Sequence, residues 1–216
     1  MVANMARIDD YKQARELAKN ELKDLDPDLL SLLSEAGYPK EKDGRKGLIL
    51  DFLNREVFIT WPDMDIIYSD ANDELSIQQQ VLILHYFNGC FISNGAPLTG
   101  EWISFQEIPD GRFYMGPFFK RAKDPLLKTF GEKPGLLIDI ASKEYEASPF
   151  DHGDFSVIIN AFPLVPIALV LWEGDEEFPP EGNVLFDKNI SKILSAEDVA
   201  WLAGMAIYPM IGMANK

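Results

Sequence analysis

Apolar residues near the start of the chain recur at helical spacing. They are Ile8, Tyr11, Ala14 and Leu17. With charges between them, these positions predict a helix from about residue 8 to 20. A second helix is predicted after Asp26, a good capping residue, with Pro27 at its first position and Gly37 at its end. Residues 1–46 are therefore expected to form a helical N-terminal segment.

The pattern changes near residue 48. The stretch GLILDFLNREVFITWPDMDIIY is rich in β-branched and aromatic residues and is interrupted by turn residues, which predicts two or three short antiparallel strands. The stretch SIQQQVLILHYFNGC then predicts a helix, because Ser76 and Gln79 match a capping box and Gly89 suits its end. This helix is apolar nearly all round, so we expect it to be buried.

Glycine and proline are frequent from Ser93 to Gly116, which predicts a loop-like region that also carries aromatic residues. From Phe118 to Phe130 the spacing predicts a basic amphipathic helix on an otherwise acidic protein. Its basic residues are Lys120, Arg121, Lys123 and Lys128. A helical or irregular piece is expected from residue 136 to 147.

Two apolar stretches in the last third predict a β-hairpin. DFSVIINAF alternates, PIALVLWE is continuously apolar, and a turn centred between Leu164 and Val165 would join them. A strand that is apolar on both sides must be covered on both sides, so PIALVLWE is expected to be central in its sheet. VLFD predicts another strand, and the capping pattern from Ser195 to Asp198 predicts a C-terminal helix.

Together these elements predict an α+β fold in which antiparallel sheet packs with helices. We expect one domain over residues 1–216, with the helical segment over 1–46, a body over 47–216 and a helix at the C-terminal end. No internal repeat, linker or low-complexity tract is evident.

The predicted hairpin bears on a cluster of acids. With its turn centred as above, Asp154 lies opposite Asp175 and His152 lies opposite Glu177, so DHGD and GDEE would meet at the open end of strands 154–160 and 167–173. Carboxylates gathered in this way would bind a divalent cation such as Ca²⁺ or Mg²⁺, or a transition metal if His152 takes part. The alternative is that the acids only end strands, where turns favour Asp.

Charge narrows the classes of partner. The chain has 35 acidic and 20 basic residues and a formal net charge of −15, so nucleic acid and anionic membrane are not expected as partners. Cations, cationic ligands and basic protein surfaces are favoured. The sequence shows no apolar run of signal-peptide or membrane-spanning length, and we expect a cytoplasmic protein.

The inventory of reactive residues is small. One cysteine, Cys90, cannot form an intramolecular disulfide or supply a thiolate cluster, which excludes an iron–sulfur centre within the chain. The chain has two histidines, no nucleophile-elbow motif, no Walker A motif and no dinucleotide-binding glycine motif. No cofactor is therefore expected beyond the divalent cation considered above.

Three strings carry a resemblance to a family: APLTGEWISFQEIPDGRFY, PLVPIALVLWEGDEEFPPEGNVLFD and LSAEDVAWLA. They resemble the family called domain of unknown function 3786 over about residues 48–201. The resemblance implies an origin in anaerobic bacteria or archaea and a neighbourhood of corrinoid and one-carbon metabolism, with an iron–sulfur or corrinoid protein as partner, but no established activity. The matching positions that combine aromatic surface with acids, and so suggest a ligand pocket, are Trp102, Trp172, Asp175, Glu177 and Asp187.

Three functional hypotheses follow. The first is a non-catalytic accessory protein that binds a small ligand or a protein partner in anaerobic cofactor or one-carbon metabolism. The second is a metal-dependent, hydrolytic enzyme, whose candidate ligands are Asp154, Asp175, Glu177 and His152. The third is an interaction module whose basic helix over residues 118–130 docks an acidic partner.

Overall fold

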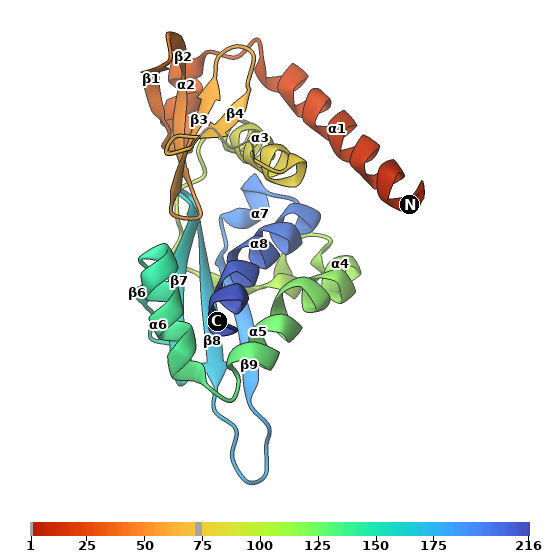
Figure 1. Ribbon diagram of the computed structural model, residues 1–216, viewed down its shortest axis with the longest axis vertical. Helices are drawn as coiled ribbons and strands as arrows, with labels where there is room; N and C mark the ends of the chain where they lie inside the picture. The colour runs from red at the N-terminus through yellow and green to blue at the C-terminus, as the bar shows by residue number, and fades with distance from the viewer. Residues whose placement is uncertain (1, 72–74) are drawn as a thin grey trace. The chain divides into compact units, whose positions relative to one another are not determined.

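The computed structural model describes the backbone of residues 2–71 and 75–216 (Figure 1). The chain divides into two compact units, each described by itself below. Unit 1 is Met1–Pro97 with Lys192–Leu194, and unit 2 is Leu98–Ser191 with Ser195–Lys216. This division into compact units does not test whether residues 1–216 form a single domain, which stays a prediction. Both units contain helices and antiparallel sheet, so the predicted α+β class is confirmed.

Unit 1 combines three helices with a four-stranded antiparallel sheet in the order β1-β2-β3-β4 within its described residues. Asp26 caps the second helix by accepting the Asp28 N–H at 3.0 Å, and Ser76 and Gln79 form the predicted capping box of the third. The elements are α1 (Val2–Leu22), α2 (Pro27–Ser34), β1 (Gly37–Lys42), β2 (Arg45–Phe52), β3 (Arg55–Thr60), β4 (Ile66–Tyr68) and α3 (Ile77–Ile92). Much later in the chain comes the short helix α7 (Ile190–Ile193), of which only the last two residues belong to unit 1.

Two expectations for unit 1 are wrong. The segment 1–46 is not wholly helical, because β1 begins at Gly37 and pairs with β2 through the tight turn at Asp43 and Gly44. The helix α3 does not end at Gly89 but runs on to Ile92. A Cβ at residue 89 would overlap the carbonyl of Ile193, so this glycine permits a close approach of two backbones and does not cap the helix.

Unit 2 contains a five-stranded antiparallel sheet in the order β5-β9-β8-β7-β6. Its strands are β5 (Trp102–Ser104), β6 (Ser148–Pro149), β7 (Phe155–Phe162), β8 (Val165–Trp172) and β9 (Glu181–Asp187). Its helical elements are η1 (Phe105–Glu107), α4 (Gly111–Phe118), the π-helical η2 (Phe119–Lys123), α5 (Asp124–Phe130), α6 (Pro134–Tyr145) and α8 (Ala196–Ala214). The strand β8 is central and buried along nearly all its length, as predicted.

The helices of unit 2 cover one side of this sheet. They contact it through α6 and α8 on β7 and through α5 on β9 (Figure 1). A Cβ at Gly182, the partner of Leu171 in the ladder, would lie 3.6 Å from Leu127 of α5. Because facing residues in an antiparallel ladder share a side, the odd-numbered positions of β8 point toward the helices, and Ala168, Val170 and Trp172 point away.

The region expected to be a loop from Ser93 to Gly116 contains β5, η1 and most of α4, so that expectation is wrong in part. Short elements are stable here because Phe105 and Phe118 stack with ring centroids 4.1 Å apart. The basic helix predicted over residues 118–130 is present, but as η2 followed by α5. No helix within the described residues is long and apolar enough to cross a membrane.

Candidate functional site

The predicted hairpin of β7 and β8 is confirmed, but its predicted register is wrong. The ladder places Phe155 opposite Leu171 and Phe162 opposite Val165, so the turn is Pro163 and Leu164. A bulge between Asn160 and Phe162 shifts the pairing further. Asp154 therefore lies beside the end of β8, where its N–H donates to the Leu171 carbonyl at 3.0 Å, and it does not face Asp175.

The acids beyond β8 shape the β8–β9 loop, residues 173–180. One carboxylate oxygen of Asp175 accepts the N–H groups of Glu177 at 2.8 Å and Phe178 at 2.7 Å. These two hydrogen bonds hold the pKa of Asp175 below its usual range. Glu177 is exposed in the same loop.

The predicted metal candidates do not come together. Asp154 and His152 lie in the β6–β7 connection, residues 150–154, whereas Asp175 and Glu177 lie in the β8–β9 loop. Asp154 uses one carboxylate oxygen to accept the Glu173 N–H at 2.9 Å. Among the residues that the structure describes, no group of three or more His, Cys, Asp and Glu side chains is placed to hold a metal ion.

The aromatic candidates do come together, on the side of the unit 2 sheet that points away from the helices. The ring centroids of Trp102 and Phe150 are 4.9 Å apart, those of Phe150 and His152 are 5.8 Å apart, and those of His152 and Trp172 are 5.9 Å apart. Beneath these rings lie the buried side chains of Ala168, Val170 and Leu185, with Ile158 also packed on them. We call Trp102, Phe150, His152 and Trp172 the aromatic face.

The β6–β7 connection is held down on the sheet by specific contacts. Ser156 of β7 is buried, and its hydroxyl donates to the Phe150 carbonyl at 2.6 Å and accepts the His152 N–H at 3.4 Å. Gly153 has φ +65°, and a Cβ there would lie 2.6 Å from Val170 Cγ1 and 2.9 Å from the Leu171 carbonyl oxygen. The connection therefore crosses close to this side of the sheet, and its contacts place the rings of Phe150 and His152 there.

Asp187 ends β9 on the same side as Trp102, its partner in the ladder. Its side chain is 2% exposed and accepts hydrogen bonds from the Thr99 N–H and hydroxyl, the Gly100 N–H and the Asn189 N–H. Burial alone would raise the pKa of Asp187, but these donors together hold it below its usual range. Asp187 thus fixes the turn that leads into β5, the strand that begins at Trp102.

Sequence reasoning found Trp102, Trp172 and His152 but missed Phe150, Gly153 and Ser156. Phe150 and His152 are two residues apart, a spacing that places side chains on one side of an extended segment, and this was the available signal. The role of Gly153 depends on the approach of β8 from elsewhere in the chain, which has no local signature.

A second region lies at the basic helix. A hollow of about 810 Å³ is lined by Lys120, Lys128 and Lys133 together with apolar side chains that include Tyr208 and Ile211. The other two basic residues of the predicted patch are engaged within unit 2. The Arg121 guanidinium lies 4.2 Å from the ring centroid of Trp201, and the Lys123 ammonium lies 3.4 Å from a carboxylate oxygen of Glu181.

Comparison with known proteins identifies a family. The sequence model of the family described as "Domain of unknown function (DUF3786)" matches residues 28–208. Neither the comparison with curated proteins nor that with solved structures found a match. The matched range includes every residue of the aromatic face and all the strands of both sheets. Because the match covers far more than half of the chain, the protein belongs to the DUF3786 family.

Proposed function

We propose that the protein is a non-catalytic binding protein and that the aromatic face recognises a basic segment of a protein partner. The observation that carries the proposal is the gathering of Trp102, Phe150, His152 and Trp172 on a side of the sheet where strands and a connection, not helices, supply the packing side chains. The two tryptophans and Phe150 are partly buried and His152 is exposed, so each retains some accessible surface.

The charges around the aromatic face favour a cationic group. Asp151, Asp154 and Glu173 are exposed, and none of the three forms an ion pair within the described part of the chain. A guanidinium or ammonium group attracted by these carboxylates can lie over a tryptophan ring, where cation–π interaction adds to the attraction. The net charge of −15 acts in the same direction at longer range.

The placement of the two tryptophans along the sheet favours a polypeptide over a small molecule. In the ladders Trp102 pairs with Asp187 and Trp172 pairs with Glu181, six positions apart along β9, so the aromatic face is extended along the strands. A small molecule needs a concave site that covers most of its surface, whereas a protein partner can bind a shallow one. The family resemblance adds iron–sulfur and corrinoid proteins of anaerobic metabolism as the first partners to examine.

Catalysis by a nucleophilic thiolate is disfavoured by the chemistry of Cys90, the one cysteine. It is buried in unit 1, and burial raises the pKa of its thiol to about 12 despite a hydrogen bond with Tyr86. A thiol in this environment is not a thiolate near neutral pH and is a poor nucleophile.

The test uses two labelled peptides of equal length, one rich in arginine and one rich in glutamate. We expect the arginine-rich peptide to bind, as measured by fluorescence anisotropy, and Trp102→Leu and Trp172→Leu each to weaken it by about tenfold, the loss typical of an aromatic anchor. Phe113→Leu is the matched control, because Phe113 is 85% exposed on α4 and outside the aromatic face.

Non-specific attraction to an acidic protein would survive both tryptophan substitutions. Binding that is equally strong in the wild type and in the two tryptophan variants would therefore overturn the proposal. Circular dichroism of each variant verifies that the fold is retained.

A further inference from the structure

A groove along α5 joins two surfaces of unit 2. The lysine hollow, the 810 Å³ space lined by Lys120, Lys128 and Lys133, shares Asp124, Lys128 and Glu132 with a smaller hollow of about 410 Å³. That hollow shares residues 131–132 and 179–180 with a third one of about 530 Å³, which is lined by the β8–β9 loop. The groove therefore runs from the C-terminal part of α8 across α5 to the β8–β9 loop.

The lysine end of this groove carries three lysines against two acids, Asp124 and Glu132, and is partly apolar. Lys120, Lys128 and Lys133 are at least partly exposed, and none of them forms an ion pair within the described residues. Tyr208, which is 53% exposed, and Ile211 supply apolar surface beside them. This end is complementary to a segment that carries several acids and a large apolar side chain.

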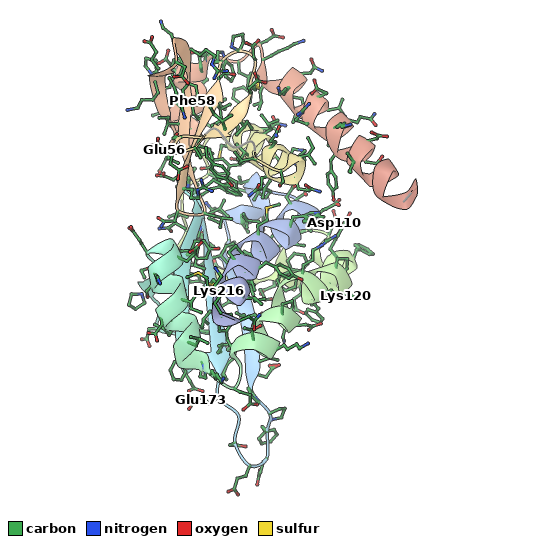
Figure 2. All side chains as sticks on the ribbon, in the orientation of Figure 1. Glu56, Phe58, Asp110, Lys120, Glu173 and Lys216 are labelled. Atoms are coloured by element: carbon green, nitrogen blue, oxygen red, sulfur yellow. The ribbon has the colours of Figure 1, made fainter. Side chains whose placement is uncertain are left out.

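The loop end of the groove has the opposite character. Asp175, Glu176 and Glu177 follow one another in the loop, and the ring of Phe178 is 67% exposed. The loop extends beyond the ends of β8 and β9 (Figure 1), and Figure 2 shows Glu173 where the loop begins and Lys120 on the helical stretch between α4 and α5. The chain thus carries both the acidic apolar segment and the basic hollow suited to it.

Contacts within the β8–β9 loop hold its backbone in one shape. Two of its acidic side chains, however, have no basic partner within the described part of the chain. The Asp175 N–H donates to the Phe178 carbonyl at 2.8 Å, and a Cβ at Gly174 would lie 2.7 Å from the ring of Pro180. Glu176 and Glu177 form no ion pair within the described part of the chain. A loop held in one shape loses little conformational entropy when it binds.

We propose that two copies of the chain associate through these surfaces, with the β8–β9 loop of each copy docked in the lysine hollow of the other. Because the loop and the hollow lie on one continuous groove, a two-fold axis makes both contacts at once and closes the assembly at a dimer. Phe178 then covers the apolar surface at Tyr208, and Glu176 and Glu177 face the lysines. The four rings of the aromatic face line none of these three hollows, so the dimer and the proposed function are tested by substitutions at different residues.

The experiment is sedimentation equilibrium of the intact protein from micromolar to near-millimolar concentration at physiological ionic strength. We expect a concentration-dependent dimer. Lys128→Glu alone and Glu177→Lys alone should each raise the dissociation constant by at least about tenfold, because every substitution acts twice in a two-fold dimer and brings like charges together. Lys143→Glu is the control, since Lys143 is exposed on α6 and lines none of the three hollows.

An equimolar mixture of the two variants is the decisive measurement. In a mixed pair, the introduced carboxylate at position 128 of the first variant would meet the introduced ammonium at position 177 of the second. The unchanged Glu177 of the first would meet the unchanged Lys128 of the second, so the mixture should dimerise as the wild type does.

Three results would each overturn the proposal: a wild type that stays monomeric throughout, a Lys128→Glu variant that dimerises normally, or a mixture that does not recover. Assemblies that grow beyond the dimer would contradict the two-fold arrangement.

Discussion

The two sides of the unit 2 sheet are buried by different means. On the helix side, Leu169, Leu171 and Phe186 are fully buried, and Phe186 lies among the stacked rings of Phe105 and Phe118. On the other side, the small residues Ala168 and Val170 are equally inaccessible, but the three rings and Ile158 that pack on them are only partly buried. Complete burial of a strand on both sides therefore does not mean that two layers of helix enclose it.

The largest expected effect is on the free energy of unfolding, and it should differ between the two sides of the sheet. Phe186→Ala should lower the free energy of unfolding by about 4 kcal/mol, because it opens a cavity within close-packed aromatic side chains. Trp102→Leu, on the opposite side, should cost only about 1 kcal/mol, because the tryptophan is partly solvated and the leucine still covers the sheet. Urea unfolding followed by circular dichroism measures both values. Equal losses would show that the aromatic face is as much a core as the helix side.

The second effect concerns the polar anchor of the aromatic face. Asp187→Asn should destabilise the protein by about 2 to 3 kcal/mol, because the N–H donors of residues 99, 100 and 189 lose a buried carboxylate. The pKa of Asp187 is lower in the folded protein than its usual value, so its contribution is complete above about pH 4 and disappears as pH falls through the lower folded value.

Unfolding free energy measured between about pH 5 and pH 2 should therefore fall less steeply in Asp187→Asn than in the wild type. Parallel curves for the two proteins would mean that the carboxylate is not held in its charged form by these donors.

The smallest expected effect on stability concerns Gly153, where the β6–β7 connection crosses the sheet. Gly153→Ala should cost about 1 to 2 kcal/mol, since the residue has a positive φ and its new Cβ would press on Val170. Gly100→Ala is the matched control, with φ +71° and nothing within 4 Å of a Cβ. The difference in thermal stability between the two variants measures the cost of the steric overlap, because both variants carry the cost of a positive φ. If the control is destabilised as much as Gly153→Ala, contact with the sheet contributes nothing.

Local signals predicted the elements of this fold well. Asp26, Ser76 and Ser195 cap the helices that their sequence patterns indicated, and the uninterrupted apolar stretch of β8 correctly placed that strand at the centre of its sheet. Each of these inferences depends on residues that are close together in the chain.

The errors arose where backbone irregularities or distant segments decide the outcome. The register of the hairpin depends on a turn at Pro163 and Leu164, one residue earlier than predicted, and on the bulge near Asn160, so that Asp154 is not opposite Asp175. The position of Gly89 within a continuing helix depends on the backbone of Ile193, a segment far along the chain. The aromatic candidates were found by residue type, but their arrangement depends on the contact of Gly153 with β8, which no nearby residue encodes.

The edge strands of the unit 2 sheet affect how the protein can aggregate. β5 has three residues and β6 has two, one of which is Pro149, a residue without a backbone N–H. Edges this short expose few unpaired backbone groups to which a strand of another molecule could add, so growth into a continuous intermolecular sheet is disfavoured. A concentrated solution of the folded protein should therefore resist fibril formation even though its central strands are among the most apolar segments of the chain.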